Sequence, residues 1–463
     1  MIFETTLAFS GAVHAEVKNH LFPGDGLEAA AILICARTPC PRLRLLVRDA
    51  VLVPHIACGN RQRDAITWSG EYLEQAIDVA EPDGCILILI HSHPGGLLAF
   101  SVADDESDRR VIPSLFHAFG DLHGSAVMIE DGAIRARLYD SGLHEQPIDL
   151  VTVSGDDLRY WWADSVINHG FRNRPVAFTS GMTTELGRLS ALVIGASGTG
   201  SIVAEQLARL GFGRIQAVDF DRVELKNLNR ILNSSRADAD ASRLKVDVFA
   251  EAVNGYRGEG VAIPVPASIT TRDAVLAAAD CDVVFCCVDT LEARHIADLI
   301  AAAFLLPLFD VGVVIPVRKK EDTFAIADVC GRIDYVQPGG STLRDRGIYT
   351  PESLRGEYLR NVAPEAHQQE FEAGYLRGLV DEAPAVITLN MRAASACVNE
   401  FIARAYPFRL EPNGLYARTE FSLAACEEEY FAETAFTRTS NPILARGSAE
   451  PLLGMPMLKG PGR

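Results

Sequence analysis

Two histidines, a serine and an aspartate stand close together in the sequence, in an arrangement that suits a metal ion. His91 and His93 end an apolar stretch, and Ser101 and Asp104 follow after seven intervening residues. Side chains at positions i and i+2 of a strand project to the same side, so both imidazoles can reach one ion. Asp104 begins an expected helix and can supply a third ligand. Two imidazoles and one carboxylate suit Zn²⁺ and leave a fourth position for water, which the ion makes nucleophilic near neutral pH.

The order and spacing of these residues resemble the signature of the JAMM metalloproteases, which is His-x-His, seven residues, then Ser-x-x-Asp, with a glutamate upstream. The resemblance implies that His91, His93 and Asp104 bind zinc. It also implies that Glu28 activates the water and that Ser101 steadies the oxyanion. That family cleaves isopeptide or peptide bonds after the C-terminal tail of ubiquitin-like proteins. The simpler alternative is that the histidines merely close a strand and that Asp104 caps a helix.

A glycine-rich segment in the second half of the chain has the form of a nucleotide-binding loop. The loop begins at Gly195, after an apolar strand, and opens an expected helix whose amides can approach a phosphate. Ser197 replaces the middle glycine of the G-x-G-x-x-G pattern, but Gly198 and Gly200 remain. Asp219 ends the next expected strand, where a carboxylate can take ribose hydroxyls. On these residues alone, an NAD-dependent oxidoreductase fits as well as an ATP-binding enzyme.

The residues after that strand resemble the signature of the ThiF family, which contains ubiquitin-activating and sulfur-carrier-activating enzymes. In that family a D-x-D-x-V run leads to N-L-x-R, and here Asp219–Val223 leads to Asn227–Arg230. The resemblance extends over residues 172–404 and includes the segment 383–390. It implies that the second half of the chain binds ATP and Mg²⁺ and adenylates a C-terminal carboxylate.

The same resemblance implies a role for each residue of an adenylation site. Arg230 and Lys245 supply cations for the ATP phosphates, and Asp289 supplies a carboxylate for Mg²⁺. Asn227 orients the phosphate, and Arg174 reaches the site across a homodimer interface. The remaining nucleotide contacts come from the glycine loop and the D-x-D run, namely Gly195, Gly198, Gly200, Asp219 (ribose) and Asp221. The simpler alternative is that these are loop polar residues on a solvated face.

The segment 337–347 departs from the family pattern. Relatives usually carry a cysteine that accepts the activated C-terminus, and often Cys-x-x-Cys pairs that bind a structural zinc. Thr342 and Asp345 stand where relatives have C-L-x-C, and none of the ten cysteines forms such a pair, so we expect no structural zinc. The enzyme then stops at the acyl-adenylate, or Ser341 or Thr342 accepts an oxyester with the help of a base. Cys330 is a third candidate acceptor, although its apolar neighbours favour a structural thiol.

Two blocks of elements must position these sites, which makes the chain an α/β protein. Residues 1–146 are expected to form an α+β domain, which the JAMM resemblance makes cytidine-deaminase-like. Residues 147–188 are expected to form a helix and a linker, and residues 189–440 a Rossmann-like, doubly wound parallel sheet. Residues 441–463 carry repeated Pro and Gly and are expected to extend over the surface. The first block is expected to contain strands at Ala29–Ala36, Leu43–Leu52, Cys85–His91, Ser125–Glu130 and Ala133–Tyr139, and helices at Ser69–Ala80 and Ala103–Phe119.

Length and composition limit the classes of partner. A chain of 463 residues indicates two or three domains, and a net charge of −18 argues against nucleic acid as the principal partner. The first residues lack the features of a signal peptide, and the apolar runs are too short to cross a bilayer. The ten scattered cysteines are typical of reduced thiols. We therefore expect a cytoplasmic protein without a membrane partner.

The two resemblances predict a bifunctional enzyme of a bacterial ubiquitin-like modification pathway. Its zinc peptidase trims or releases a ubiquitin-like protein, and its second domain adenylates the exposed C-terminal glycine with ATP and Mg²⁺. A ubiquitin-conjugating-type carrier protein is a further candidate partner. Two alternatives remain open on the sequence: a pseudo-enzyme that only binds the ubiquitin-like tail, and an NAD-dependent oxidoreductase fused to a metallopeptidase.

Overall fold

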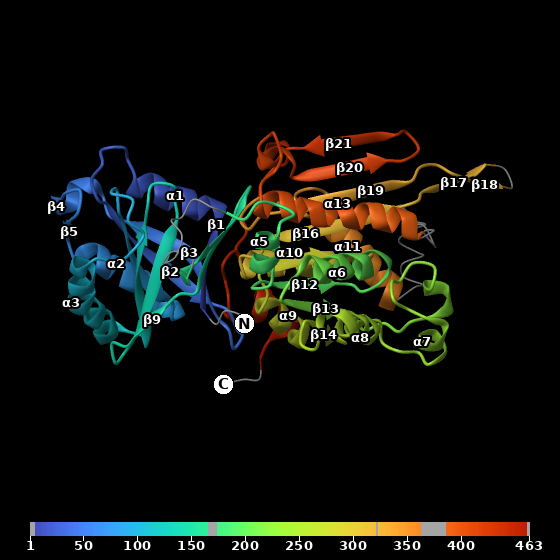
Figure 1. Cartoon of the computed structure of the whole chain (residues 1–463), viewed down its shortest axis with the longest axis horizontal. Helices are drawn as coiled ribbons and strands as arrows, with labels where there is room; N and C mark the ends of the chain where they lie inside the picture. The colour runs from blue at the N-terminus through green and yellow to red at the C-terminus, as the bar shows by residue number, and fades with distance from the viewer. Residues whose placement is uncertain (1–4, 165–173, 321–322, 363–385, 461–463) are drawn as a thin grey trace. The chain divides into compact units, whose positions relative to one another are not determined.

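The computed structural model describes residues 5–164, 174–320, 323–362 and 386–460. Its contacts divide the chain into two compact units (Figure 1). The N-terminal unit contains Phe3–Pro175 together with Ala302–Leu305 and Pro442–Arg463, and the C-terminal unit contains Val176–Ala301 and Leu306–Asn441. Of the helices in the described ranges, none is long and apolar enough to span a lipid bilayer.

The N-terminal unit is built on a mixed sheet of nine described strands in the order β11-β10-β1-β3-β2-β6-β7-β8-β9. The strands are β1 (Thr5–Ser10), β2 (Ala30–Arg37), β3 (Leu43–Leu52), β6 (Ile86–Ser92), β7 (Leu122–Met128), β8 (Ile134–Asp140), β9 (Glu145–Pro147), β10 (Leu150–Ser154) and β11 (Leu158–Trp162). The helices are α1 (Gly11–Leu21), α2 (Glu71–Ala80) and α3 (Val102–Ala118). A separate hairpin pairs β4 (Cys58–Arg61) with β5 (Ile66–Trp68).

Helices cover both faces of this sheet. Along β2, Ala31, Leu33 and Cys35 belong to a buried cluster that includes residues of α1, whereas Ile32 and Ile34 belong to a second cluster with α2 and α3. Successive side chains of a strand point to opposite faces, so this division places α1 on one face and α2 and α3 on the other. The N-terminal unit is therefore a three-layer arrangement with β2 and β6 near the middle of the sheet.

The structure differs from the helix that was predicted within residues 147–188, because the first part of that range forms strands. Residues Leu150–Ser154 and Leu158–Trp162 form an antiparallel strand pair, and β10 continues the N-terminal sheet by pairing in parallel with β1. β10 is buried along its whole length. Its Val and Thr residues and the aromatic residues of β11 favour strands over helices. A helix does form at Ser180–Leu186 (α5), and residues 165–173 of the range lie outside the described part of the chain.

The C-terminal unit contains a sheet of eight described strands in the order β14-β13-β12-β15-β16-β19-β20-β21. The strands are β12 (Ser190–Ile194), β13 (Arg214–Val218), β14 (Ala262–Val265), β15 (Val283–Cys286), β16 (Leu308–Val314), β19 (Cys330–Val336), β20 (Arg418–Ser422) and β21 (Glu427–Phe431), with a hairpin of β17 (Val317–Lys320) and β18 (Thr323–Ile326). The helices are α5, α6 (Gly198–Leu210), α7 (Arg236–Asp240), α8 (Lys245–Arg257), α9 (Arg272–Ala279), α10 (Leu291–Ala303), α11 (Pro351–Val362) and α13 (Ile387–Ala405).

The strand directions confirm the α/β class and correct one detail of it. β14, β13, β12, β15 and β16 run parallel, whereas β19, β20 and β21 continue the sheet antiparallel. Antiparallel neighbours need no crossover helix, and the hairpin β17–β18 lies between β16 and β19 in the sequence. The strand order reverses at β12, and open α/β sheets bind ligands at the carboxyl ends of the strands at such a point.

The C-terminal segment does not simply extend over a surface. It contains two short 3-10 helices, Leu452–Gly454 and Pro456–Leu458, and it is grouped with the N-terminal unit by its contacts. Leu452, Leu453 and Leu458 are at most 2% exposed. Burial of these leucines anchors the C-terminal segment. The prediction of an extended segment relied on its Pro and Gly content and did not consider the leucines.

Candidate functional site

The side chains of His91, His93 and Asp104 converge at the end of β6. The Nε2 atoms of the two histidines lie 3.0 Å apart. Asp104, in the first turn of α3, places one carboxylate oxygen 3.0 Å from His91 Nε2 and the other 3.5 Å from His93 Nε2. The structure therefore brings together the three side chains that the sequence analysis named as ligands.

The second ring nitrogen of His93 fixes the orientation of its imidazole. Nδ1 lies 2.7 Å from the carbonyl oxygen of Leu97, which can only accept, so Nδ1 carries the proton and Nε2 is left to bind a ligand. Burial lowers the pKa of His93, but the hydrogen bonds to Asp104 and Leu97 raise it by more, so the pKa lies above its usual value. Burial likewise opposes ionisation of Asp104, yet hydrogen bonds from His91 and His93 hold its pKa well below the usual range.

Glu28 completes the group, which we call the metal cluster (Glu28, His91, His93 and Asp104). It precedes β2, whose residue Ala30 pairs with His91, so the two strands bring the glutamate beside the imidazoles. Ligand atoms of Glu28, His91 and His93 all lie within 4.8 Å of one another. The Glu28 side chain is buried, and burial raises the pKa of its carboxyl.

Ser101 caps α3 and thereby holds Asp104. The Ser101 amide donates to the Asp104 carboxylate at 2.6 Å, and the Asp104 amide donates to the Ser101 hydroxyl oxygen at 3.2 Å. This reciprocal capping box is the arrangement named above as the simpler alternative for Asp104. It does not compete with a metal role, because the hydroxyl hydrogen and the second carboxylate oxygen take no part in it.

The donor set fits a zinc ion. A tetrahedral ion with ligands at about 2.1 Å needs neighbouring ligand atoms roughly 3.4 Å apart. The separations of 3.0 and 3.5 Å between the imidazole nitrogens and carboxylate oxygens of the metal cluster are close to this value. Two neutral imidazoles and one carboxylate, with a further carboxylate nearby, are also a common chemical environment for Zn²⁺.

In the C-terminal unit, the glycine loop follows β12 and leads into α6. Gly195 has a φ of 87°, and a side chain at Gly200 would place its Cβ 1.7 Å from the Gly195 carbonyl oxygen. A Cβ at Gly198 would lie 2.3 Å from the amide nitrogen of Asn390. The loop therefore needs glycine at these three positions to keep its backbone close to the helix N-terminus, where a phosphate can bind.

The carboxylates of the D-x-D run are held by the loop and by a lysine. Asp219 accepts hydrogen bonds from the amides of Ala196 at 2.7 Å and Asp221 at 2.8 Å, which ties the end of β13 to the glycine loop. Lys245 is 5% exposed in its side chain and donates to the Asp221 carboxylate at 2.7 Å. The Lys245 ammonium is thus paired with a half-exposed carboxylate of the D-x-D run. A phosphate group could replace this carboxylate as the partner of the lysine.

Asn227 and Arg230 lie on the short turn after the D-x-D run. Asn227 is buried, and its side-chain oxygen accepts from the Glu224 amide at 3.1 Å. Arg230 donates to the Lys226 carbonyl at 3.1 Å, and its stem lies beside Gly198. The structure therefore brings Arg230 to the N-terminus of α6.

Each half of the chain matches a known family. Residues 11–139 match the prokaryotic homologues of the JAB domain, and residues 173–387 match the ThiF family. The chain joins a JAB domain to a ThiF domain. This agrees with the JAMM signature in the first half and the adenylation signature in the second.

Curated relatives of this chain include activating enzymes of ubiquitin-like modifiers. Ubiquitin-like modifier-activating enzyme 5 of Culex quinquefasciatus is 28% identical over 162 residues, which cover 32% of this chain and 37% of that protein. The Bombyx mori protein of the same name is 32% identical over 158 residues, with the same two shares. The chain thus spans little more than a third of the length of these relatives. A crystal structure of E. coli MccB with ATP has a TM-score of 0.41 at 15% identity, covering 58% of this chain and 69% of that one.

Arg174 and Asp289 are the remaining expected residues of the adenylation site. Arg174, at the end of the N-terminal unit, donates a hydrogen bond to the Leu158 carbonyl of β11 at 2.6 Å. The proposed reach of Arg174 across a homodimer interface therefore requires it to leave this contact. Asp289 is exposed and lies shortly after β15. Burial lowers the pKa of Arg294, but the charges of Asp310 and, to a smaller extent, of Asp289 raise it above its usual value.

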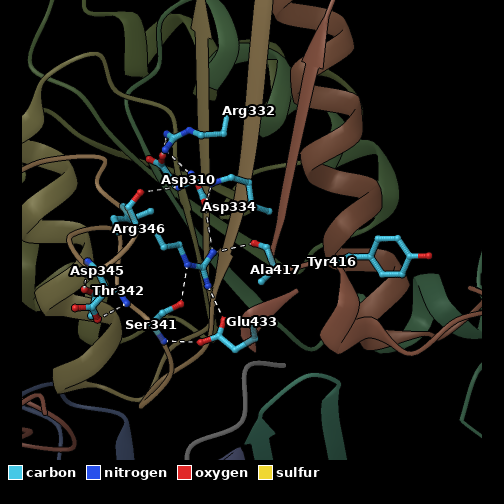
Figure 2. Close-up of polar contacts among 12 residues, drawn as sticks. Asp310, Arg332, Asp334, Ser341, Thr342, Asp345, Arg346, Tyr416, Ala417 and Glu433 are labelled. Atoms are coloured by element: carbon cyan, nitrogen blue, oxygen red, sulfur yellow. Dashed lines mark hydrogen bonds and ion pairs between the residues drawn. The ribbon is translucent and has the colours of Figure 1, made fainter. Parts of the chain in front are cut away.

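The candidate acyl acceptor Ser341 is part of a buried polar group (Figure 2). Its hydroxyl accepts from Arg346 Nε at 2.9 Å, and its amide donates to Glu433 at 2.6 Å. Arg346 also donates to Asp334 at 3.1 Å and to Glu433 at 2.8 Å. We call Asp334, Ser341, Arg346 and Glu433 the loop cluster. Because Ser341 is fully buried and held by a guanidinium, its hydroxyl lacks both the exposure and the base that an acyl acceptor needs.

The other two candidate acceptors are held in similarly unreactive surroundings. Thr342 and Asp345 cap each other: the Thr342 amide donates to the carboxylate at 3.0 Å, and the Asp345 amide donates to the hydroxyl at 3.1 Å. Burial and the neighbouring Asp328 raise the pKa of the Cys330 thiol to about 11. A thiol with such a pKa is a poor nucleophile at neutral pH.

Two residues with a place in these sites were not singled out from the sequence. Asn390 of α13 is 2% exposed and lies against Gly198. Arg137 of β8 contacts the helix that carries Asp104. Asn390 ends the segment 383–390, which the ThiF resemblance included without giving this residue a role, and Arg137 belongs to no local motif because it reaches its site from a distant strand.

Proposed function

We propose that the JAB unit hydrolyses the peptide or isopeptide bond that follows the C-terminal glycine of a ubiquitin-like protein. The observation that supports this most directly is the convergence of His91, His93 and Asp104 beside Glu28. A zinc ion held by the first three residues would polarise the scissile carbonyl and lower the pKa of a water. No contact that we describe commits these ligand atoms to a side-chain cation instead.

The side chains of the metal cluster divide the proton transfers of hydrolysis. Glu28 accepts a proton from the attacking water and passes it to the departing amine nitrogen, as the carbon–nitrogen bond breaks. The Ser101 hydroxyl donates its hydrogen to the carbonyl oxygen, on which negative charge develops. The Leu97 carbonyl keeps the His93 ring in the tautomer that metal binding requires.

We further propose that the ThiF unit adenylates the exposed C-terminal glycine of the same ubiquitin-like protein. The glycine carboxylate attacks the α-phosphorus of ATP, and the bond to pyrophosphate breaks. Arg230 and Lys245 neutralise phosphate charge, Asp289 holds Mg²⁺, and Asp219 takes the ribose hydroxyls. Gly198, Asn390 and Arg230 meeting at the start of α6 support this assignment.

The activated C-terminus is proposed to leave as the acyl-adenylate rather than on this chain. Burial of Ser341 and the raised pKa of Cys330 support this choice over an oxyester or thioester. A ubiquitin-conjugating-type carrier is the proposed recipient, and a homodimer of ThiF units the proposed assembly. Processing by the first unit then supplies the substrate of the second.

Zinc content tests the first half of the proposal. Elemental mass spectrometry of protein purified without chelator should give about one zinc per chain, and a His93→Ala variant should give none. The proposed hydrolysis is then followed by mass spectrometry on a ubiquitin-like protein that carries a C-terminal extension. A wild-type protein without zinc, or one that keeps zinc in the variant, would contradict the assignment.

Pyrophosphate exchange tests the second half. Labelled pyrophosphate should enter ATP only when a ubiquitin-like protein with an exposed C-terminal glycine is present, and a Lys245→Met variant should abolish the exchange. Binding without exchange would identify the unit as a binding module. Thermal protection by NAD but not by ATP would instead support the oxidoreductase alternative.

A further inference from the structure

The ligands of the metal cluster come from two different elements, and their distances depend on how those elements are held together. His91 is the penultimate residue of β6 and His93 follows that strand directly, so the sheet fixes both. Asp104 comes from the first turn of α3, a helix that packs on β7. Any shift of α3 along the sheet therefore moves the carboxylate relative to the imidazoles.

Arg137 connects α3 to the sheet within one turn of Asp104. The arginine belongs to β8, and its side chain is only 5% exposed. Its guanidinium donates to Asp105 at 2.7 Å, and to Asp108 at 2.6 Å from Nη2 and 3.0 Å from Nε. Asp105 and Asp108 follow Asp104 by one and four positions, so both lie next to it on the helix.

The contacts of Arg137 lie on both sides of the capping box of α3. Ahead of the box, the guanidinium stacks on the ring of Phe100 at 3.8 Å from its centre. Behind the box, Asp108 accepts hydrogen bonds from the hydroxyls of Ser125 and Tyr139 as well as from the arginine. Ser125 lies opposite Arg137 on the neighbouring strand β7. The start of α3 is thus held to β7 and β8 by Arg137 together with Ser125 and Tyr139, and of these three the guanidinium is the one that reaches both Asp105 and Asp108.

We propose that Arg137 is a positioning residue for the metal centre, which fixes Asp104 at its distance from His91 and His93 by holding Asp105, Asp108 and Phe100. The inference rests on the metal site of the proposed function. A guanidinium suits this role because its rigid fork donates in fixed directions, whereas a lysine would supply only a point charge. Arg137 touches neither metal nor substrate, so its effect passes through Asp104.

The affinity for Co²⁺ tests this role without any substrate. The full-length protein, stripped with chelator, is titrated with Co²⁺, and the visible bands report both the dissociation constant and the coordination geometry. Changes around metal ligands typically weaken affinity about 10- to 100-fold, and we expect a loss of this size in Arg137→Met. Asp105→Asn, which removes the charge of one of the arginine's partners on α3 but keeps an acceptor oxygen, should weaken binding less. Arg135→Met removes a guanidinium from the same strand and should leave the affinity within about twofold of wild type, a control margin well below that range.

A thermodynamic cycle separates positioning from general loosening of the fold. If Arg137 acts through Asp104, adding Arg137→Met to an Asp104→Asn variant should change Co²⁺ affinity by less than about twofold, because the coupled sites are not additive. An equal loss in both backgrounds, or wild-type affinity and spectrum in Arg137→Met, would overturn the inference. If wild type itself binds no Co²⁺, the proposed metal site fails, and the positioning role fails with it. Thermal melts show whether each variant is folded. If Arg137→Met is unfolded, the Co²⁺ affinity of Asp105→Asn tests the inference instead, and wild-type affinity in that variant would overturn it.

Discussion

The metal cluster and the loop cluster each bring carboxylates out of water, but their charges are compensated in different ways. In the loop cluster, Arg346 lies between Asp334, Glu433 and Ser341 and donates to all three. In the metal cluster, the described contacts join imidazoles and carboxylates, with no lysine or arginine among them. Buried carboxylates need a nearby positive charge. The loop cluster contains its own cation, whereas the metal cluster offers its lone pairs to an external one.

This difference explains the departure of residues 337–347 from the pattern of relatives. Thr342 and Asp345, which replace the expected cysteines, satisfy each other's amides, and Arg346 holds the segment to the sheet. Among the residues that the structure describes, the group of possible metal ligands is the one around His91 and His93, with Glu28 and Asp104 beside them. We therefore predict one zinc ion per chain, in the JAB unit. The following changes break or sharpen the comparison, beginning with the largest expected effect.

Substitution of His93 by alanine should abolish the function of the metal cluster. One of two imidazole ligands is lost, so we expect the zinc content to fall from about one per chain to none. Hydrolysis of an extended ubiquitin-like protein should fall about 10⁴-fold or more, which is at least ~5 kcal/mol of transition-state stabilisation. Elemental mass spectrometry and kcat/KM measure the two effects.

ATP binding to the C-terminal unit provides the control for this variant. His93→Ala should leave the thermal shift of the protein with ATP unchanged, because the substitution lies in the other unit. Persistent zinc in His93→Ala would place a metal outside the metal cluster and would undo the account of Thr342 and Asp345.

Substitution of Arg346 by methionine should give the opposite pattern, a loss of stability without a loss of zinc. Asp334 and Ser341 are both fully buried, and Asp334 would keep its charge with fewer partners. Leaving a buried charge without any partner costs about 3–5 kcal/mol, but Asp334 keeps Arg332 and Arg418, so we expect a loss of at most about 3 kcal/mol. Chemical denaturation followed by far-UV circular dichroism, together with zinc analysis, measures both quantities; tryptophan fluorescence would not serve, because Trp68, Trp161 and Trp162 all lie in the N-terminal unit.

Arg344→Met serves as the matched control, since Arg344 is exposed two residues away on the same segment. It should change the free energy of unfolding by no more than about 0.5 kcal/mol. A zinc content that falls in Arg346→Met but not in Arg344→Met would mean that the loop cluster does hold a metal.

The two clusters also differ in how far the sequence could predict them. His91, His93, Ser101 and Asp104 lie within one short segment, so a local motif predicted which side chains the structure brings together, and the strand-to-helix change between them was visible as well. The loop cluster joins Asp334, Arg346 and Glu433 from separate segments, and no local spacing records that pairing. The same reason hid Asn390 and Arg137, and it hid β10, whose place in the N-terminal sheet depends on pairing with β1.

His14 shows a third way of burying a polar side chain, which is to keep its imidazole ring neutral instead of pairing it with an ion of opposite charge. Its Nε2 lies 2.8 Å from the Gly132 carbonyl, and burial lowers its pKa from 6.5 to about 4. As the pH is lowered, His14 therefore takes up a proton at a higher pH in the unfolded chain than in the folded protein. The stabilisation is complete above pH 6.5 and is lost as the pH falls to about 4, by up to ~3 kcal/mol.

Urea denaturation of the full chain at pH 7, 5.5 and 4 measures this dependence. In His14→Gln, the drop in unfolding free energy of the JAB unit between pH 6.5 and 4 should be smaller than in wild type. His144→Gln replaces an exposed histidine in the same unit and should keep the wild-type dependence. Equal pH dependence in all three proteins would show that His14 is not buried as a neutral ring.

The smallest effect concerns the reciprocal capping of Thr342 and Asp345. Thr342→Val keeps the shape of the side chain but removes the oxygen that accepts the Asp345 amide at 3.1 Å, so we expect a loss of about 1 kcal/mol. Replacing both residues by cysteine restores the C-L-x-C pattern of relatives. It should still add no tightly bound zinc, because two thiolates supply only half of a structural site and Arg346 already occupies the neighbourhood with positive charge. A second equivalent of zinc in that double variant would show that the loop had kept the other half of a metal site, and that Arg346 does not replace the ion.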